Sequence, residues 1–374
     1  MRVKLGNYIS EYSVRNKKSE DIPVYSVTNT QGFCRDYFGK EVASKDKSTY
    51  KIVPKGCFAY NPSRINVGSV DWQRNEERVI VSPLYNVFSV SEELDQQYLY
   101  YFLKSDVALH LIKAAATGSV RDNLKFNMLC DFQINLPSLN EQKEIVHCLD
   151  KIKTIIEHRQ QQLQKLDELV KSRFIELFGD PISNPKGWKK EKAEHHIDLL
   201  SGYPFQSEQY VDEGINICGG LIIMPQKIQW QDCKHWPSVD GYEEYLLTED
   251  DIVMALDRPW ISDGFKIAQV DSAHLPALLI QRTARIRGID VNQQYLFHCF
   301  VNGGFDKHSN VTGSLVPHIS AKDIRSFEIL LPPIELQNQF AAFVEQTDKS
   351  KFEIQQSLEK LETLKKALMQ KYFG

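Results

Sequence analysis

The chain has 374 residues, of which 42% are apolar and 25% are charged, and its formal net charge is −4. This composition excludes an intrinsically disordered protein, and the length predicts two to three domains of about 100–200 residues each. No apolar run approaches the roughly 18–20 residues of a membrane span, and no signal-peptide-like apolar core lies at the N-terminus, so we expect a cytoplasmic protein without a membrane partner. Seven cysteines without a CxxC pair favour reduced thiols, and the negative charge argues at first against a strongly basic nucleic-acid-binding protein.

In chain order, the sequence predicts two globular regions, each followed by one long helix. Residues 1–137 hold short β-rich runs such as YKIVPKGCFAY, separated by turn signals such as NPS and VGS. A segment without Gly or Pro then runs from Asn140 to Phe178. Residues from about 183 to 332 repeat the β-rich pattern, and a second long helix is expected over 334–373.

The two halves are copies of one plan. TGSVRDNLKF, which begins at Thr117, aligns with TGSLVPHISA, which begins at Thr312, and the offset of 195 holds without a gap to Gly179 and Gly374. This alignment contains 17 identities over 63 positions. A further echo links QQYLYYFL with QQYLFHCF at an offset of 197. Such self-similarity predicts a duplicated architecture.

Each copy ends in a helix far longer than the usual ~11–12 residues. About 38 residues at ~1.5 Å each make a rod of roughly 57 Å. Pro137, Ser138 and Glu141 supply helix start signals, and Gly179 followed by Pro181 supplies the stop.

Apolar residues recur along both helices with an alternating spacing of four and three, which predicts a coiled coil between them. We call these positions the seam; its apolar members are Ile145, Leu149, Ile152, Ile156, Leu163, Leu166, Val170, Leu177, Phe340, Val344, Ile354, Leu358, Leu361 and Leu368. Arg159 and Arg173 interrupt the first helix, and Lys351 and Lys365 interrupt the second. At each of these positions the other copy is apolar, which indicates a hetero-paired coil whose polar residues select the register. The alternative is two separate amphipathic helices.

The charge is uneven along the chain. Residues 1–137 carry a net +3, residues 180–332 carry −7, and both long helices are neutral. Neither globular region is broadly basic, so bare electrostatic capture of nucleic acid should be modest. A local basic face remains compatible with these totals, because net charge does not report distribution.

Two tetrapeptides resemble the motif (Asn/Asp/Ser)-Pro-Pro-aromatic of adenine methyltransferases. They are Asn61-Pro62-Ser63-Arg64 and Asp257-Arg258-Pro259-Trp260, at similar places in the two halves. Each breaks the pattern, and no Gly-rich loop for S-adenosylmethionine follows a strand upstream. A turn that presents polar side chains to a ligand, or a plain structural turn, therefore explains them better than methyl transfer.

Other catalytic constellations are missing from the sequence. The ten histidines are scattered, and neither His195-His196 nor Cys233-x-His235 completes a tetrahedral metal set, so we expect no metal. Asp250-Asp251 fits a turn before a strand better than a nuclease site. No phosphate-binding loop of the Walker type supports ATP hydrolysis.

Basic residues interleaved with amides and aromatics stand out near the repeated elements. Arg and Lys grip guanine edges and phosphates, and Asn reads adenine, so these residues are candidates for DNA contacts, with ordinary solvated charge as the alternative. The candidates are Asn61, Arg64, Asn66, Arg74, Arg121, Lys125, Arg258, Trp260, Lys266, Arg282, Arg285 and His318.

The repeat architecture and several strings resemble the specificity subunit of Type I restriction-modification systems. LPSLNEQKEI from Leu136 and its copy LPPIELQNQF from Leu331 match the entry into the family's long helices, although Leu336 stands where the first copy has Glu141. FIELFGDP from Phe174 matches the exit from the first helix. AYNPSRINVGSV at 59–70 and IQRTARI at 280–286 resemble strings common in the family's target-recognition domains.

The resemblance implies an α+β fold with two pseudo-repeated target-recognition domains and an antiparallel two-helix coiled coil, related by a pseudo-two-fold axis. The implied segments are a first recognition domain at 1–137, a long helix at 138–179, a second recognition domain at 180–332 and a long helix at 333–374.

It also implies a non-catalytic chain in which each domain reads one half of a split double-stranded DNA site while the paired helices set their separation. Two modification subunits would bind S-adenosylmethionine and methylate adenine N6, with motor-nuclease subunits as further partners and no cofactor on this chain. Two alternatives remain: a self-sufficient adenine methyltransferase around Asp257 to Trp260, and a coiled-coil scaffold that binds no DNA.

Overall fold

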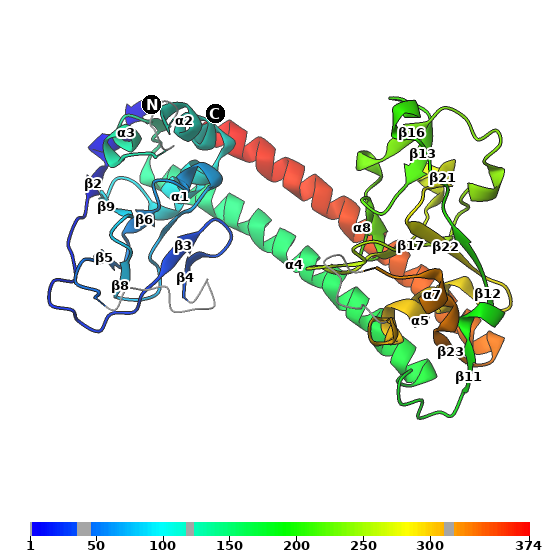
Figure 1. The fold of residues 1–374 in the computed structure, drawn as a ribbon. Helices are drawn as coiled ribbons and strands as arrows, with labels where there is room; N and C mark the ends of the chain where they lie inside the picture. The colour runs from blue at the N-terminus through cyan, green and yellow to red at the C-terminus, as the bar shows by residue number, and fades with distance from the viewer. Residues whose placement is uncertain (1, 36–45, 117–122, 310–317) are drawn as a thin grey trace. The chain divides into compact units, whose positions relative to one another are not determined.

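The chain folds into two compact units, whose elements are labelled in Figure 1. The residues that the computed structural model describes are 2–35, 46–116, 123–309 and 318–374. The first unit comprises Met1–Gln161 and Gln355–Gly374, and the second comprises Gln162–Ile354. Each unit therefore contains one globular domain and a segment of each long helix.

The globular domain of the first unit mixes short strands with short helices. Its strands are β1 (Arg2–Lys4), β2 (Ile9–Glu11), β3 (Ser26–Thr28), β4 (Gly32–Cys34), β5 (Lys51–Pro54), β6 (Phe58–Tyr60), β7 (Val70–Trp72), β8 (Arg78–Val81), β9 (Asn86–Val90) and β10 (Gln133–Asn135). Its helices are α1 (Gln96–Lys104), α2 (Asp106–Ala116) and α3 (Phe126–Cys130), with 3-10 turns η1 (Leu5–Asn7) and η2 (Ile65–Val67).

The second unit uses the same kinds of element with additional strands between 202 and 251. Its strands are β11 (Lys189–Lys192), β12 (Ile197–Ser201), β13 (Ile215–Cys218), β14 (Ile223–Met224), β15 (Lys227–Ile228), β16 (Lys234–Trp236), β17 (Ile252–Ala255), β18 (Trp260–Ile261), β19 (Gly264–Phe265), β20 (Ile267–Gln269), β21 (Ala277–Leu279), β22 (Thr283–Gly288) and β23 (Glu328–Leu331). Its shorter helices are α5 (Gln293–Asn302), α6 (Phe305–His308) and α7 (Ala321–Ser326). Its 3-10 turns are η3 (Ala193–His195), η4 (Ser207–Gln209), η5 (Trp230–Asp232), η6 (Glu243–Tyr245) and η7 (Ser272–His274).

The sheet topology repeats between the two units. An antiparallel sheet in the order β2-β9-β6-β7 has its counterpart in β12-β22-β17-β20. The pair β1-β10 likewise has its counterpart in β11-β23. The sequence repeat therefore corresponds to a structural repeat, and the α+β fold with two pseudo-repeated domains is confirmed.

Helix α1 and helix α5 hold equivalent places against their domains. Tyr98 of α1 donates its hydroxyl hydrogen to the Asn135 carbonyl at 2.8 Å, and Tyr295 of α5 donates to the Leu330 carbonyl at 2.9 Å. Both tyrosines are fully buried. The repeated string QQYL thus has a structural role, because its tyrosine ties a helix to the last strand of the domain.

The long helices are α4 (Leu139–Phe178) and α8 (Ile334–Phe373). Ser138 and Glu141 form a capping box at the start of α4, where the Ser138 backbone N–H and hydroxyl donate to the Glu141 carboxylate at 2.9 and 2.7 Å. At its end, Gly179 adopts a φ of 80°, a left-handed conformation that glycine reaches at little cost. The capping signals read from the sequence thus stand at the ends of the helix.

The helix segments run antiparallel within each unit. In the first unit, the start of α4 shares a core with the end of α8 (red in Figure 1), through Leu149 and Phe373. In the second unit, the end of α4 meets the start of α8, where the rings of Phe174 and Phe178 each lie 5.5 Å from the ring of Phe340. Each domain therefore packs against the start of one long helix and the end of the other.

Every apolar seam position named above is buried or half-buried. The pattern found the fully buried Leu149 and Phe340 but missed three other deep positions near the helix ends, Phe174, Phe178 and Phe373. These aromatic rings stand one residue beyond the heptad positions because they pack against the globular domains as well as against the other helix.

The charged seam residue Lys351 pairs with carboxylates of both long helices. Its ammonium group pairs with Asp167 of α4 at 2.7 Å and with Asp348 of its own helix at 3.3 Å. The offset of 195 identifies equivalent positions in the two copies of the sequence. Because the helices pair in antiparallel directions, equivalent positions do not face each other. Lys351 therefore faces a different part of α4, which supplies a carboxylate.

No helix in the described part of the chain is long and apolar enough to cross a membrane. The seven cysteines, all of which are described, form no disulfide.

Candidate nucleic-acid interface

Both tetrapeptides lie in loops that follow the equivalent central strands β6 and β17. In each unit a residue two positions before a short helix holds this loop by a backbone hydrogen bond. The Leu124 N–H donates to the Pro62 carbonyl at 3.1 Å, and the Ile319 N–H donates to the Leu256 carbonyl at 2.8 Å. The duplicated sheet thus presents one loop of similar position in each domain.

The loop of the first domain is held by local contacts. Asn61 accepts hydrogen bonds from the Ser63 N–H at 3.1 Å and from the Ser63 hydroxyl at 2.9 Å, which makes a tight turn. Arg64 is exposed, Asn61 and Asn66 are half-buried, and Lys125 is exposed at the start of α3. Arg64 and Lys125 are therefore accessible to a polyanion, whereas Arg121 lies outside the described residues.

Arg74 has a set of protein partners. Its guanidinium donates to the Asp71 carboxylate at 2.7 Å and to the Gln97 amide oxygen at 3.1 Å, and it lies 4.4 Å from the centre of the Trp72 ring. The buried Asp71 also accepts the Phe33 N–H at 3.1 Å, which ties hairpin β3–β4 to the sheet. Arg74 is thus part of a structural network, which accounts for it without DNA.

Two of the basic candidates in the second domain are buried. Lys266 donates to the Gly220 carbonyl, and burial lowers the pKa of its ammonium group. Arg285 pairs with Asp198 across strands β22 and β12. Alternation along β22 explains this pair, because Ala284 and Ile286 point into the core while the arginine lies on the opposite face. Both cations are engaged with protein groups, so neither is free to reach DNA in this conformation.

The exposed candidates of the second domain gather around Asp257. Its carboxylate pairs with Arg282 at 3.0 Å and with His318 at 2.6 Å, and Arg258 is exposed beside it. Trp260 is half-buried and stacks on Phe265 with ring centres 5.1 Å apart. The sequence pattern did not indicate the pairing role of Asp257, because its partners lie 25 and 61 residues away in the chain.

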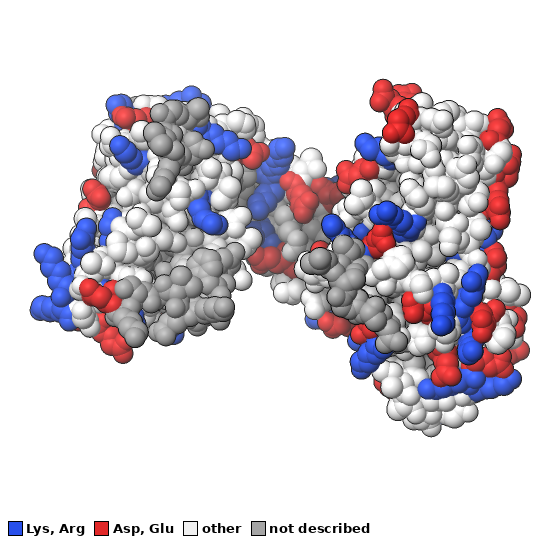
Figure 2. All heavy atoms as spheres, viewed as in Figure 1, with Lys and Arg blue, Asp and Glu red and all other residues white. Residues whose placement is uncertain are grey.

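The negative charge of the second domain is concentrated in one segment. Residues 201–251 hold ten Asp and Glu against two Lys, while the rest of 180–332 holds twelve Lys and Arg against eleven Asp and Glu. Figure 2 shows acidic side chains gathered over the end of the second unit that carries β13 and β16. The loop after β17 therefore lies on a part of the sequence that is close to neutral, which removes the conflict between the total charge and DNA binding.

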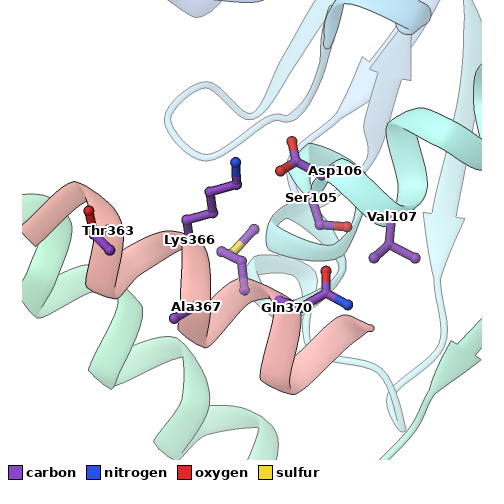
Figure 3. Close-up of a pocket in the computed structure, with 8 residues that line it drawn as sticks. Ser105, Asp106, Val107, Thr363, Lys366, Ala367 and Gln370 are labelled. Atoms are coloured by element: carbon purple, nitrogen blue, oxygen red, sulfur yellow. The ribbon is translucent and has the colours of Figure 1, made fainter.

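One cavity lies beside the start of α2 and the last turns of α8 (Figure 3). It has a volume of about 290 Å3, and its lining residues are Ser105, Asp106, Val107, Thr363, Lys366, Ala367, Met369 and Gln370. Only Asp106 and Lys366 are charged in this lining. Among the described residues, no group of three or more His, Cys, Asp or Glu is placed to hold a metal ion.

Comparison with known proteins decides which family has this arrangement. Residues 3–168 and 239–366 match the family model of the Type I restriction modification DNA specificity domain. The chain belongs to this family. Its function is accordingly DNA recognition as a specificity subunit of a Type I restriction-modification system.

Specificity subunits of two organisms are similar to this chain in sequence. The MjaVIII specificity subunit of Methanocaldococcus jannaschii is 24% identical over 309 residues, which cover 78% of this chain and 72% of that protein. The EcoAI specificity subunit of Escherichia coli is 30% identical over 200 residues, which cover 50% of this chain but only 33% of that protein.

Solved structures share the fold of this specificity subunit. The S subunit of the Type I system from M. genitalium has a TM-score of 0.57 at 14% identity and covers all of this chain and 96% of its own. A chain from a structure of a type I R-M system has a TM-score of 0.59 at 17% identity, with coverage of 100% and 97%.

Proposed function

We propose that this specificity subunit reads a bipartite DNA site, with one half read by each globular domain. The observation that carries the proposal is the duplicated sheet, which presents an equivalent loop with an exposed cation in each unit, Arg64 in the first and Arg258 in the second. The exposed Arg282, which directly precedes β22, lies beside the second loop and pairs with Asp257. Cations of this type grip phosphates and guanine edges. The long helices α4 and α8 would hold the two readers at a fixed separation.

The proposed partners supply the chemistry. Two modification subunits bind the long helices and adjacent surfaces, hold S-adenosylmethionine, and methylate adenine N6 in the recognised site. Motor-nuclease subunits join the assembly for restriction, and the complex acts in the cytoplasm. This chain itself is proposed to be non-catalytic and to bind no cofactor.

The decisive experiment is a methylome of cells that express this chain with its modification partner. We expect methylated adenines in a split motif with an unread spacer of constant length. Half-sites one helical turn apart are separated by ~34–36 Å, which a helix of 40 residues at ~1.5 Å per residue can span. A complex that methylates no motif would contradict the proposal.

Two rival functions have their own tests. A self-sufficient methyltransferase predicts stoichiometric binding of S-adenosylmethionine by the isolated chain, which calorimetry would detect. A scaffold without DNA binding predicts that the complex with the modification subunit shifts no duplex in a gel. We expect the isolated chain to bind no S-adenosylmethionine and the complex to shift DNA that carries the methylated motif.

A further inference from the structure

Three segments of the second domain converge on Asp257. The Leu256 N–H donates to the Arg282 carbonyl at 2.9 Å, and the Ile319 N–H donates to the Leu256 carbonyl at 2.8 Å. Asp257 and His318 also form an isolated antiparallel β-bridge. The backbone therefore brings the loop after β17, the residue before β22 and the segment before α7 to one place.

The carboxylate of Asp257 uses both of its oxygens in this cluster. Oδ2 pairs with a terminal nitrogen of Arg282 at 3.0 Å, and Oδ1 lies 2.6 Å from Nδ1 of His318. The side chain of Arg282 is nevertheless 73% exposed and that of His318 is 54% exposed, whereas Asp257 is 31% exposed. One partially covered anion thus holds two side chains whose other donors face solvent.

The backbone at this cluster is unfavourable for the residues that occupy it. Arg258 has a φ of 46° and Arg282 has a φ of 63°, both in the left-handed region. Glycine or asparagine adopts that conformation readily, whereas a long cationic side chain gains nothing from it. Strained residues at an exposed loop point to a functional use of the side chain, because stability alone would favour a different residue.

The chemistry of the cluster fits the reading of DNA. Because one terminal nitrogen of Arg282 is held, the remaining guanidinium donors are pre-oriented toward solvent, where they match a phosphate or the edge of guanine. Holding Nδ1 of His318 leaves its Nε2 available to a ligand. Asp257 itself repels a polyanion, so its presence among these cations is explained by what it orients.

The equivalent loop of the first domain lacks this arrangement. Asp257 follows Leu256, whose carbonyl accepts the Ile319 N–H, and Ser63 takes the same place after Pro62, whose carbonyl accepts the Leu124 N–H. Ser63 has no carboxylate, and its N–H and hydroxyl donate to Asn61 of the same turn. The pairing of one carboxylate with an arginine and a histidine is therefore a feature of one recognition domain and not of the shared scaffold. This is expected of a residue that sets sequence preference.

We propose that Asp257 is a positioning residue that holds Arg282 and His318 in the orientation with which the second domain reads its DNA half-site. This inference rests on the proposed function, since it assigns the second half-site to this cluster. Loss of the carboxylate releases both side chains and relaxes base preference in that half-site only.

The test uses Asp257→Asn in the full chain, assembled with its modification subunit, and duplexes that carry the methylome-derived site or one changed base pair in either half. We expect discrimination in the second half-site to fall roughly tenfold, because a well-placed arginine contact to a base edge supplies discrimination of this order. Discrimination in the first half-site should not change.

Asp240→Asn is the matched control, because it removes the same charge from an exposed turn of the same unit, where Asp240 bonds only Ser238 in the described structure. Removal of an acid from that turn should leave both discrimination ratios unchanged and should raise total affinity slightly. If Asp257→Asn behaves like Asp240→Asn, the inference is overturned.

A second variant decides the matter if Asp257→Asn does not fold. Arg282→Asn introduces a residue that tolerates the left-handed backbone at this position, so the melting temperature should not change. The variant should reduce the same discrimination ratio as Asp257→Asn. Unchanged discrimination in Arg282→Asn also overturns the inference. An unaltered complex that modifies no split motif would instead contradict the proposed function, so the two failures are distinct.

Discussion

A single amide in the first turn of each long helix shows how one residue can join two elements. Gln142 is fully buried; its side-chain oxygen accepts the Asp95 N–H at 2.8 Å, and its amide nitrogen donates to the Pro137 carbonyl at 2.9 Å. Gln337 repeats both bonds, with the Asn292 N–H and the Pro332 carbonyl, each at 2.9 Å. The repeated glutamine therefore locks each long helix to the start of α1 or α5.

Gln142→Ala should destabilise the first unit by about 2–3 kcal/mol, because it removes the partner of the Asp95 N–H and of the Pro137 and Glu93 carbonyls. Thermal unfolding of the full chain measures this loss. The control is Gln161→Ala, an exposed position of the same helix, for which a change within about 0.5 kcal/mol is expected. Equal melting temperatures of Gln142→Ala and Gln161→Ala would show that the buried amide does not stabilise the contact between the helix and the domain.

His196 makes a pH-dependent contact in the second unit. Its Nδ1 lies 2.8 Å from Asp290 and its Nε2 lies 2.9 Å from Glu191, so both ring nitrogens donate to carboxylates in the charged form. Burial acts to lower the pKa of His196, but the hydrogen bonds to Asp290 and Glu191 outweigh it and raise that pKa above its ordinary value. A raised folded-state pKa stabilises the fold fully below about pH 6.5, and the effect disappears as the pH rises through the folded value.

The melting temperature of His196→Gln should therefore lie well below that of the unaltered protein at pH 5.5. This difference in melting temperature should become smaller toward pH 9. Melting temperatures over this pH range give the measurement. His195→Gln is the control, because His195 is an exposed neighbour whose nearest carboxylate, that of Glu194, is 4.0 Å away. A difference that is constant with pH would rule out the charged His196 contact.

At the scale of elements, the pairing of α4 with α8 depends on direction as well as on pattern. The heptad spacing indicated that the helices pair, but it did not determine which residues face each other. The ion pair between Lys351 and Asp167 exists because the helices are antiparallel. A charged residue at a half-buried seam position is stabilised there by the carboxylate of the other helix.

Reversing this charge tests the register. Lys351→Glu places three carboxylates together and should lower the free energy of unfolding by about 1 kcal/mol or more, which is about 2–4 °C in the melting temperature for a unit of this size. Adding Asp167→Lys should restore part of the loss. Lys360→Glu, the same change at an exposed position of α8, should have little effect. Failure of the double variant to recover would argue against the contact.

At the scale of the whole molecule, each domain is completed by both long helices. Phe373, at the end of α8, packs on Tyr98 of the first domain with ring centres 5.1 Å apart, and Phe178, at the end of α4, packs on Tyr295 of the second at 4.6 Å. A domain can thus be exchanged only if it keeps the tyrosine that receives the helix end.

Exchange of residues 1–137 for those of a relative that retains a tyrosine at the position of Tyr98 should change one half of the methylated motif. The other half and the spacer should stay the same, because α4, α8 and the second domain are unaltered. Methylome sequencing reads out both halves at once. The reciprocal exchange of 180–332 is the control, and a change in both halves after either exchange would disprove independent readers.

The sequence alone determined the duplication, the α+β class and the extent of the long helices. These follow from patterns that can be read along the chain: capping residues and heptad spacing act within a few turns, and the duplication is visible as a repeated string. It also indicated exposed candidates such as Arg64 and Arg282, because Arg and Asn near turns are recognisable by type.

Only the tertiary structure decided which of those candidates are accessible. Lys266 and Arg285 are buried against groups that lie 46 and 87 residues away in the chain, and the pairing of Asp257 with His318 spans 61 residues. Contacts of this range arise when the sheet forms and leave no periodic trace in the sequence. The heptad pattern left the helix direction open, since the same seam residues would fit a parallel pair; the antiparallel direction that the family resemblance implied is confirmed by the packing.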